Sequence, residues 1–376
     1  MGGVLTVPAG RPFVDILARR MIAVHGPGGD GRLADAMVFL PTRRAVRSLR
    51  EAFLRAGDGA AMMLPLIRPL GDLSEDEPPL LTLDPADEAE LPPAIAQTAR
   101  RMLLSQLIAR MPDRAAGPAE ALGLADALAG LMDEVQTERL DFDRLAELAP
   151  ERFQTHWQET LTFLRIVTEH WPALLEGRGE IDPAARRDRL MAMLADRWRA
   201  ERPDFPVYIA GSTGSVPGTA DLMAAALALP AGHVVLPALE TAMEPRDREA
   251  ALEEPGHPQH GMLRLLQRLH VSPGDVEVLE APAAAPRLHL LREVLRPAAT
   301  TDRWRDLGDL PRDALAGLAL VEAPEPRTEA AAIALKLREA LETPEKTAAL
   351  VTPDRTLGRR VAAELTRFVT LDAVPE

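Results

Sequence analysis

The fold class of this chain follows from one stretch, VFLPTRRAVRSL, at residues 38–49. It begins within an apolar segment, residues 36–40, that ends at Pro41, and this pattern predicts a short buried β-strand. From Thr42 to Leu54 apolar residues return at helical spacing while the arginines fall largely on the other side, which predicts an amphipathic helix. A buried strand that leads directly into such a helix is typical of an α/β protein.

The residues before this stretch repeat the same order. An apolar segment, residues 4–7, is followed by a turn with Pro8, Gly10 and Pro12, and then by apolar residues at helical spacing from Phe13. The two halves together predict a βαβα unit, which is the pattern of a parallel sheet covered by helices.

Helical periodicity dominates from about residue 93 to residue 199. The predicted helices are Ile95–Ala109, Pro118–Glu138, Phe142–Leu148, Phe153–Leu175 and Pro183–Arg199. Strand patterns then return at Val207–Ala210 and His233–Leu236. We therefore expect an α/β domain of residues 1–85 and 205–312, split by an all-α insertion of residues 86–204.

A second α/β unit is expected at residues 313–376. Its predicted strands are Leu318–Glu322 and Ala348–Val351, each followed by a predicted helix, Glu329–Leu341 or Leu357–Phe368. Two strand–helix pairs are fewer than a doubly wound domain needs. The pattern thus favours the interpretation that the chain is the front part of a longer protein.

Composition excludes several classes of function. The 376 residues correspond to about two to three domains. The chain has 0 Cys, which removes thiolate zinc sites, iron–sulfur clusters and cysteine nucleophiles. Its only lysines, Lys336 and Lys346, do not stand in a G-x-x-x-x-G-K-[ST] phosphate loop, so a functional P-loop ATPase is not expected.

Charge and hydropathy indicate the compartment and the partners. The formal net charge of -14 repels a polyanion at long range, so nucleic-acid binding would need a local arginine patch or a partner. No run of about 18 apolar residues occurs, and the first ten residues do not resemble a signal peptide. We expect a soluble, cytoplasmic protein without a membrane partner.

Two segments are candidate sites for an anion. Thr42, Arg43, Arg44 and Arg47 stand at the start of the predicted helix, where backbone amides, a hydroxyl and guanidinium groups can meet phosphates together. The alternative for the arginines is a solvated helix face. The turn Gly211–Ser215, which contains Ser212 and Thr213, follows a predicted strand and also suits an anion, although its glycines equally suit a plain tight turn.

A serine hydrolase or a phosphate-binding α/β enzyme is the alternative function that would use the Gly211–Ser215 turn. Ala210-Gly211-Ser212-Thr213-Gly214 differs by one residue from the G-x-S-x-G nucleophile elbow. Asp221 and either His233 or His257 follow in the chain order that a triad requires, but neither Asp221 nor His233 falls where a triad member usually lies. The 8 histidines form no H-x-x-x-H pair, and we expect no metal site.

The chain resembles a known family through a series of short motifs. Residues 38–49 resemble the strand-to-helix element of superfamily 1 helicases in which Thr-Arg-x-Ala touches single-stranded DNA. Together with LPLI at residues 64–67, LGD at 70–72 and AGSTGS at 210–215, they are similar to AddB proteins of the alphaproteobacterial type. Further matching segments are HPQHG at 257–261, LRPA at 295–298, TTDRW at 300–304 and LVTPDR at 350–355. AddB is the second subunit of the AddAB helicase-nuclease, which processes double-strand breaks for recombination.

The resemblance implies a superfamily 1 helicase-like fold without a motor. Residues 7–13 stand where a helicase has its phosphate loop, and they contain no lysine. Ala210 and Gly211 stand where the magnesium-binding carboxylates should follow a strand. Both the positioning and the charge neutralisation that phosphoryl transfer needs are therefore missing, and no active site is evident in the chain.

The resemblance also implies partners and DNA contacts. In the family, the inactive helicase-like part holds the AddA-type motor subunit and inspects the passing single strand for a recombination hotspot, within a complex that acts on duplex ends. Thr42, Arg43 and Arg44 would be the first DNA contacts, with Arg47 beside them and Ser212, Thr213 and Arg355 as weaker ones. The family's nuclease metal and iron–sulfur cluster belong to a C-terminal domain outside these 376 residues, so no cofactor is expected here.

Overall fold

The computed structural model describes residues 2–58, 60–70, 91–110, 117–141, 166–282 and 285–372. Two compact units divide the chain, residues 1–310 and 311–376. The predicted helix Phe142–Leu148 and most of the predicted helix Phe153–Leu175 lie outside the described residues, as do Gly71 and Asp72 of one family-like motif.

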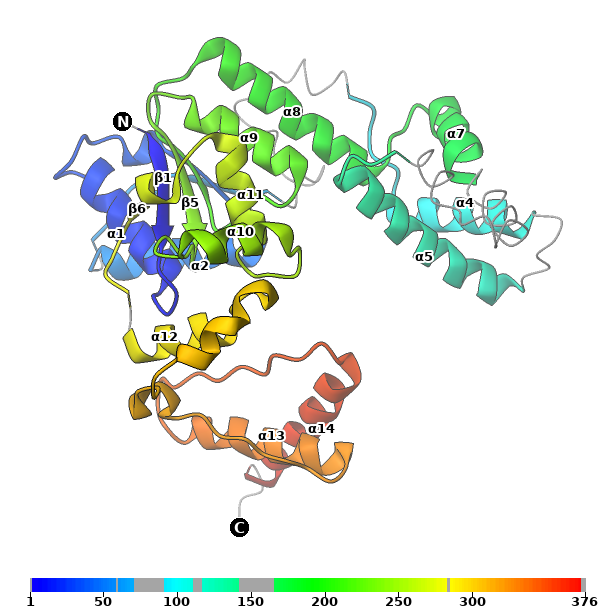
Figure 1. Cartoon of the computed structure of the whole chain (residues 1–376). Coiled ribbons are helices and arrows are strands. Elements are labelled where there is room, and N and C mark those ends of the chain that lie inside the picture. The colour runs from blue at the N-terminus through cyan, green and yellow to red at the C-terminus, as the bar shows by residue number, and fades with distance from the viewer. Residues whose placement is uncertain are drawn as a thin grey trace. The chain divides into compact units, whose positions relative to one another are not determined.

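The first unit is built on a parallel six-stranded sheet (Figure 1). The strand order is β3-β2-β4-β5-β1-β6. The strands are β1 (Gly3–Val7), β2 (Met37–Leu40), β3 (Leu66–Pro69), β4 (Val207–Ala210), β5 (Gly232–Pro237) and β6 (Glu277–Val278). In the register, Met37 lies opposite Val207 and Phe39 opposite Ile209. The α/β fold class predicted from the sequence is confirmed.

Helices cover both faces of this sheet. On one face α1 (Phe13–His25) and α2 (Arg43–Ala56) pack on the strand side chains that include Val38, Leu40 and Tyr208. On the other face lie α8 (Pro183–Glu201), α9 (Pro217–Leu227) and α11 (His260–Leu269), which pack on Phe39, Ile209 and their neighbours. Burial on both faces explains why these strands are continuous apolar runs rather than alternating ones.

The helical segment lies in sequence between β3 and β4. Its described helices are α4 (Gln97–Ala109), α5 (Pro118–Thr137), α7 (Trp171–Arg178), which follows a single π-turn at residues 166–170, and α8. The first three share a separate core around Leu104, Leu128 and Trp171. The helix α8 instead belongs to the core of the sheet, through Leu194 and Trp198.

The region after β5 contains one helix that apolar periodicity did not indicate. Helix α10 (Pro245–Glu253) begins with a proline at its first position, and it buries Ala251 and most of Asp247 and partly buries Leu252, while most of its other side chains are polar. Helix α12 (Ala285–Val294) and a 3₁₀ segment (Ala298–Asp306) complete the first unit. No described helix is both long enough and apolar enough to span a bilayer.

In the second unit, the predicted helices form but the predicted strands do not. Helices α13 (Pro326–Leu341) and α14 (Arg355–Asp372) form and pack through Ala330, Ala334 and Val361. The segments predicted as strands, residues 318–322 and 348–351, belong to no sheet among the described residues, and Leu320 and Val351 are 87% and 93% exposed. An apolar segment becomes a strand only when a neighbour satisfies its backbone, and no described segment supplies one here.

Candidate functional site

The candidate site lies where β2 and β4 end. These strands are neighbours in the parallel sheet, so the segments that follow them emerge at the same edge. The chain leaves β2 through α2 on one face towards β3, and it leaves β4 through α9 on the other face towards β5. Connections that diverge in this way open a crevice at the carboxyl edge, which is where open α/β sheets bind ligands.

Gly211 brings the two predicted segments together. Its φ of 76° lies in the left-handed region, and a Cβ there would be 3.5 Å from Cδ of Pro41 and 3.4 Å from Cε1 of Phe13. Gly214 also has a positive φ, 64°, and a Cβ there would lie 2.7 Å from Cδ2 of Leu265. The two glycines are therefore required by backbone conformation, and at Gly214 by close packing as well.

The start of α2 carries several exposed positive charges. The Thr42 hydroxyl caps the helix by accepting a hydrogen bond from the Ala45 N–H at 3.1 Å. Arg43, Arg44 and Arg47 are all exposed, and the first turn contains no acidic residue. Within the described part of the chain, Arg44 and Arg47 form no ion pair.

Several other exposed arginines differ from these two because they have carboxylate partners. Arg55, at the end of the same helix, pairs with Asp15 at 2.7 Å. Arg246 pairs with Asp302 at 2.9 Å and Arg101 with Asp126 at 2.7 Å. In a chain with a net charge of -14, Arg44 and Arg47 thus place two positive charges without an ion pair to any described residue at the carboxyl edge.

Of the other predicted DNA contacts, Ser212 and Thr213 belong to the first unit and Arg355 to the second. Ser212 accepts a hydrogen bond from the Gly214 N–H at 3.3 Å, and Thr213 donates to Ser215 Oγ at 3.3 Å, so both hydroxyls shape the turn. Arg355 is exposed at the first position of α14 in the second unit. The structure thus brings the Thr42 and Ser212 segments to one edge of the first unit, whereas Arg355 belongs to the second unit.

The segment after β1 is a closed turn. Gly10 has a φ of 76°, and the Arg11 N–H bonds to the Pro8 carbonyl at 3.3 Å. The Arg11 side chain donates to the backbone carbonyls of Ala281 at 2.9 Å and Pro282 at 3.4 Å. The guanidinium nearest to this turn is therefore occupied by the chain itself.

The contacts of the proposed triad residues give a hydrolase no support. Both carboxylate oxygens of Asp221 are engaged, Oδ2 by Arg139 at 2.6 Å and Oδ1 by Arg268. His257 Nδ1 accepts from the Gln259 N–H at 3.1 Å, and Nε2 donates to the Leu295 carbonyl at 2.9 Å. Neither side chain is directed at Ser212 through any described hydrogen bond.

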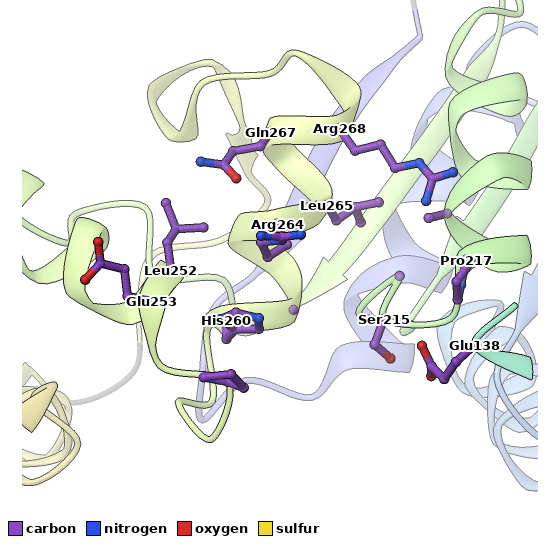
Figure 2. A pocket seen from close by; sticks show the side chains of 14 residues that line it. Glu138, Ser215, Pro217, Leu252, Glu253, His260, Arg264, Leu265, Gln267 and Arg268 are labelled. Atoms are coloured by element: carbon purple, nitrogen blue, oxygen red, sulfur yellow. The ribbon is translucent and has the colours of Figure 1, made fainter. Parts of the chain in front are cut away.

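A pocket of about 950 Å³ opens beside the turn (Figure 2). Its wall includes Gly214 and Ser215, the start of α9 at Pro217, and one face of α11. The side chains of His260 and Arg264 on α11 border it, as does Glu253 from α10. Sequence reasoning missed this pocket because α10 and α11 reach the turn only through the fold.

A polar cluster lies near the amino ends of β4 and β5. His25 Nδ1 donates to Asp30 at 2.9 Å, and its Nε2 accepts from the Tyr208 hydroxyl at 2.9 Å. The His233 ring stacks on Tyr208 with ring centroids 4.5 Å apart. Burial raises the pKa of Tyr208, and burial together with the neighbouring His25 lowers the pKa of His233 to about 4.

This shift predicts a loss of stability in mild acid. The folded chain keeps His233 neutral down to about pH 4, whereas the unfolded chain protonates it below about pH 6.5. The unfolded state therefore binds the extra proton between these values, and the free energy of unfolding should fall by about 3 kcal/mol as the pH drops from 6.5 to 4.

Urea titrations of the wild type and of His233→Phe at several pH values measure this contribution. The phenylalanine variant keeps a ring that can stack on Tyr208, and its stability should be less dependent on pH in the window between 4 and 6.5. Parallel curves for the two proteins would contradict the assignment to His233.

In comparisons with known proteins, no family model matches this chain, and no curated protein matches it either.

Proposed function

We propose that this chain is a non-catalytic, helicase-like scaffold of the AddB type that binds single-stranded DNA at the carboxyl edge of its sheet. The observation that carries the proposal is the exposed cluster at the start of α2, where Arg44 and Arg47 have no ion pair with any described residue. A strand of phosphates is the ligand that compensates several such charges in a row.

The geometry around the cluster supports this choice. The α2 N-terminus lies beside the Gly211 turn, at the crevice where parallel sheets bind ligands. The parallel sheet interrupted in sequence by helices α4–α8 is compatible with a helicase-like domain that has a helical insertion. The absence of lysine and carboxylate at the two nucleotide-site positions favours a scaffold over a motor.

The same reasoning extends to the partners. A scaffold without its own phosphate lysine cannot move along DNA by itself, so the proposal includes an AddA-type motor subunit in a complex that processes double-strand breaks. Recognition of a hotspot sequence belongs to the proposal through the family resemblance alone. Co-purification of a large ATPase with a tagged copy of the chain tests the partnership.

Removing the two unpaired charges should weaken DNA binding strongly. Each phosphate contact contributes about 0.7 to the salt exponent of single-strand binding, so losing two contacts at 0.1 M salt should reduce the affinity by roughly tenfold to thirtyfold. The double variant is Arg44→Gln with Arg47→Gln, and the measurement is the fluorescence anisotropy of a labelled 20-mer at several salt concentrations.

The control has the same change in net charge. Arg101→Gln with Arg199→Gln removes two arginines whose charges are already paired with Asp126 and Asp196, and its affinity should change by less than about twofold. Equal affinities for the wild type and the α2 variant would overturn the assignment of these residues. ATP hydrolysis by the purified chain would contradict the scaffold itself.

A further inference from the structure

The pocket beside the Gly214–Ser215 turn shares that turn with the proposed DNA site. The turn forms part of its wall and also follows β4, whose end lies next to Pro41 at the start of the α2 segment. A single strand that crosses the carboxyl edge over the turn would therefore pass beside the pocket. Its volume, about 950 Å³, is within the range of small-molecule sites and is ample for a nucleotide.

Arg264 is the cation of this pocket that remains available. It is exposed on α11 and forms no ion pair with a described residue. Arg268, one turn further along the helix, differs because its guanidinium is bound to Asp221. Figure 2 shows both arginines on the same wall, so a phosphate at this wall would meet one uncommitted guanidinium.

His260 contributes an acceptor rather than a donor. Its Nδ1–H donates to the Ala251 carbonyl at 3.1 Å, which leaves the neutral ring with a lone pair on Nε2. No described group bonds to that nitrogen, and the ring borders the pocket. The backbone of α10 thus determines which ring nitrogen of His260 is left to accept a hydrogen bond.

The carboxylates of the wall add further acceptors. Glu253 from α10 and Glu138 at the end of α5 both line the pocket, are exposed, and form no ion pair within the described chain. Gln267 is the only neutral amide side chain among the lining residues. Apart from Arg264, the uncommitted side chains of the wall therefore accept hydrogen bonds more than they donate them.

Resting on the proposed function, we propose that this pocket receives one nucleotide of the bound strand and prefers cytosine to thymine. Arg264 holds the phosphate, while the carboxylate of Glu253 accepts a hydrogen bond from the exocyclic amino group of the base. The two pyrimidines differ at position 4, where cytosine has an amino donor and thymine a carbonyl acceptor. A wall of acceptors therefore favours the amino group and repels the carbonyl.

The test compares labelled dC and dT 20-mers, bound to the purified chain at pH 7.5 and 0.1 M salt. The wild type should bind the dC strand about fivefold more tightly, the difference that one hydrogen bond makes. In Glu253→Gln the new amide can donate to the thymine carbonyl, so the preference should fall to about one. Glu249→Gln, an exposed residue of the same helix outside the pocket, should retain the preference.

A second variant tests the phosphate contact. Arg264→Gln should weaken both strands equally, by about fivefold, and should reduce the salt exponent by about 0.7. Arg264→Lys keeps the charge and should recover most of the lost affinity. Arg199→Gln, which removes an arginine paired with Asp196, should leave both affinities unchanged.

The outcomes separate the two proposals. If the wild type binds both strands equally, and the α2 variant weakens binding while the Arg264 and Glu253 variants do not, the pocket proposal is wrong and the proposed function stands. A preference for the dT strand also overturns the role of Glu253. If the wild type binds neither strand, both the proposed function and the pocket proposal are wrong.

Discussion

Replacing Arg100 with alanine should lower the free energy of unfolding by about 3–5 kcal/mol, because the substitution leaves a buried carboxylate without its counter-charge. Arg100 and Asp182 are 1% and 2% exposed, and Nε of the arginine lies 2.9 Å from Oδ1 of the aspartate. The N–H is not directed at that oxygen, so this contact is an ion pair without a hydrogen bond.

The effect should be large because Asp182 connects several helices. Its Oδ2 accepts from Trp171 Nε1 at 2.9 Å and from Gln136 Nε2 at 2.8 Å, and the residue itself precedes α8. Arg100 also reaches Asp133 at 2.8 Å. Loss of the guanidinium therefore destabilises the junction of α4, α5, α7 and α8 at once.

The neighbouring residue provides the control. Arg101 pairs with Asp126 at the surface, where both side chains are about half exposed, so Arg101→Ala should cost no more than about 1 kcal/mol. Urea unfolding of both variants, followed by circular dichroism at 222 nm, makes the comparison. Similar midpoints for the two variants would show that the buried pair contributes little.

Replacing Trp198 with alanine should destabilise the sheet, although this residue lies in the helical segment of the sequence. Trp198 is 1% exposed, and its ring meets Phe39 of β2 edge-on with ring centroids 5.8 Å apart. Truncation of a buried tryptophan removes its apolar contacts and leaves a cavity, which should cost about 3–5 kcal/mol.

The matched variant is Trp304→Ala. This tryptophan is 48% exposed and donates one hydrogen bond to the Glu293 carbonyl at 3.1 Å, so its truncation leaves no enclosed cavity. The cost should be clearly smaller, about 1 kcal/mol. Hydrogen exchange of β2 and β4 amides locates the effect: faster exchange there in Trp198→Ala is expected, and unchanged exchange would contradict the packing of α8 on the sheet.

Most elements of the first unit could be predicted from local sequence. The strand ending at Leu40 and the helix after Thr42 are where the apolar pattern predicted them. A buried strand and an amphipathic helix each require a characteristic spacing of apolar residues, and that spacing can be seen within a short window of sequence. Helix α10 was missed since it buries little apolar surface and begins in a proline-containing polar stretch. Its stability comes from tertiary contacts of Ala251 and Asp247 that local periodicity does not record.

In the second unit, the sequence instead predicted elements that do not form. Residues 318–322 and 348–351 have the apolar composition of strands, and the prediction of strands there was wrong. An apolar composition shows that a segment is suited to a buried strand, but the strand forms only when a second segment lies at hydrogen-bonding distance from its backbone. That partner is a property of the whole fold and not of the segment.

The sequence by itself determined the α/β class, the arginines and Thr42 at the start of α2, and the glycines of the 211–214 turn, since each depends on residue type and near neighbours. Only the tertiary structure decided that the Thr42 and Gly211 segments meet, because strand order is set by packing between residues about 170 positions apart. It also decided which arginines are neutralised. The ion pair of Arg268 with Asp221, for example, depends on how close two helices bring these side chains, and that distance cannot be read from a single sequence.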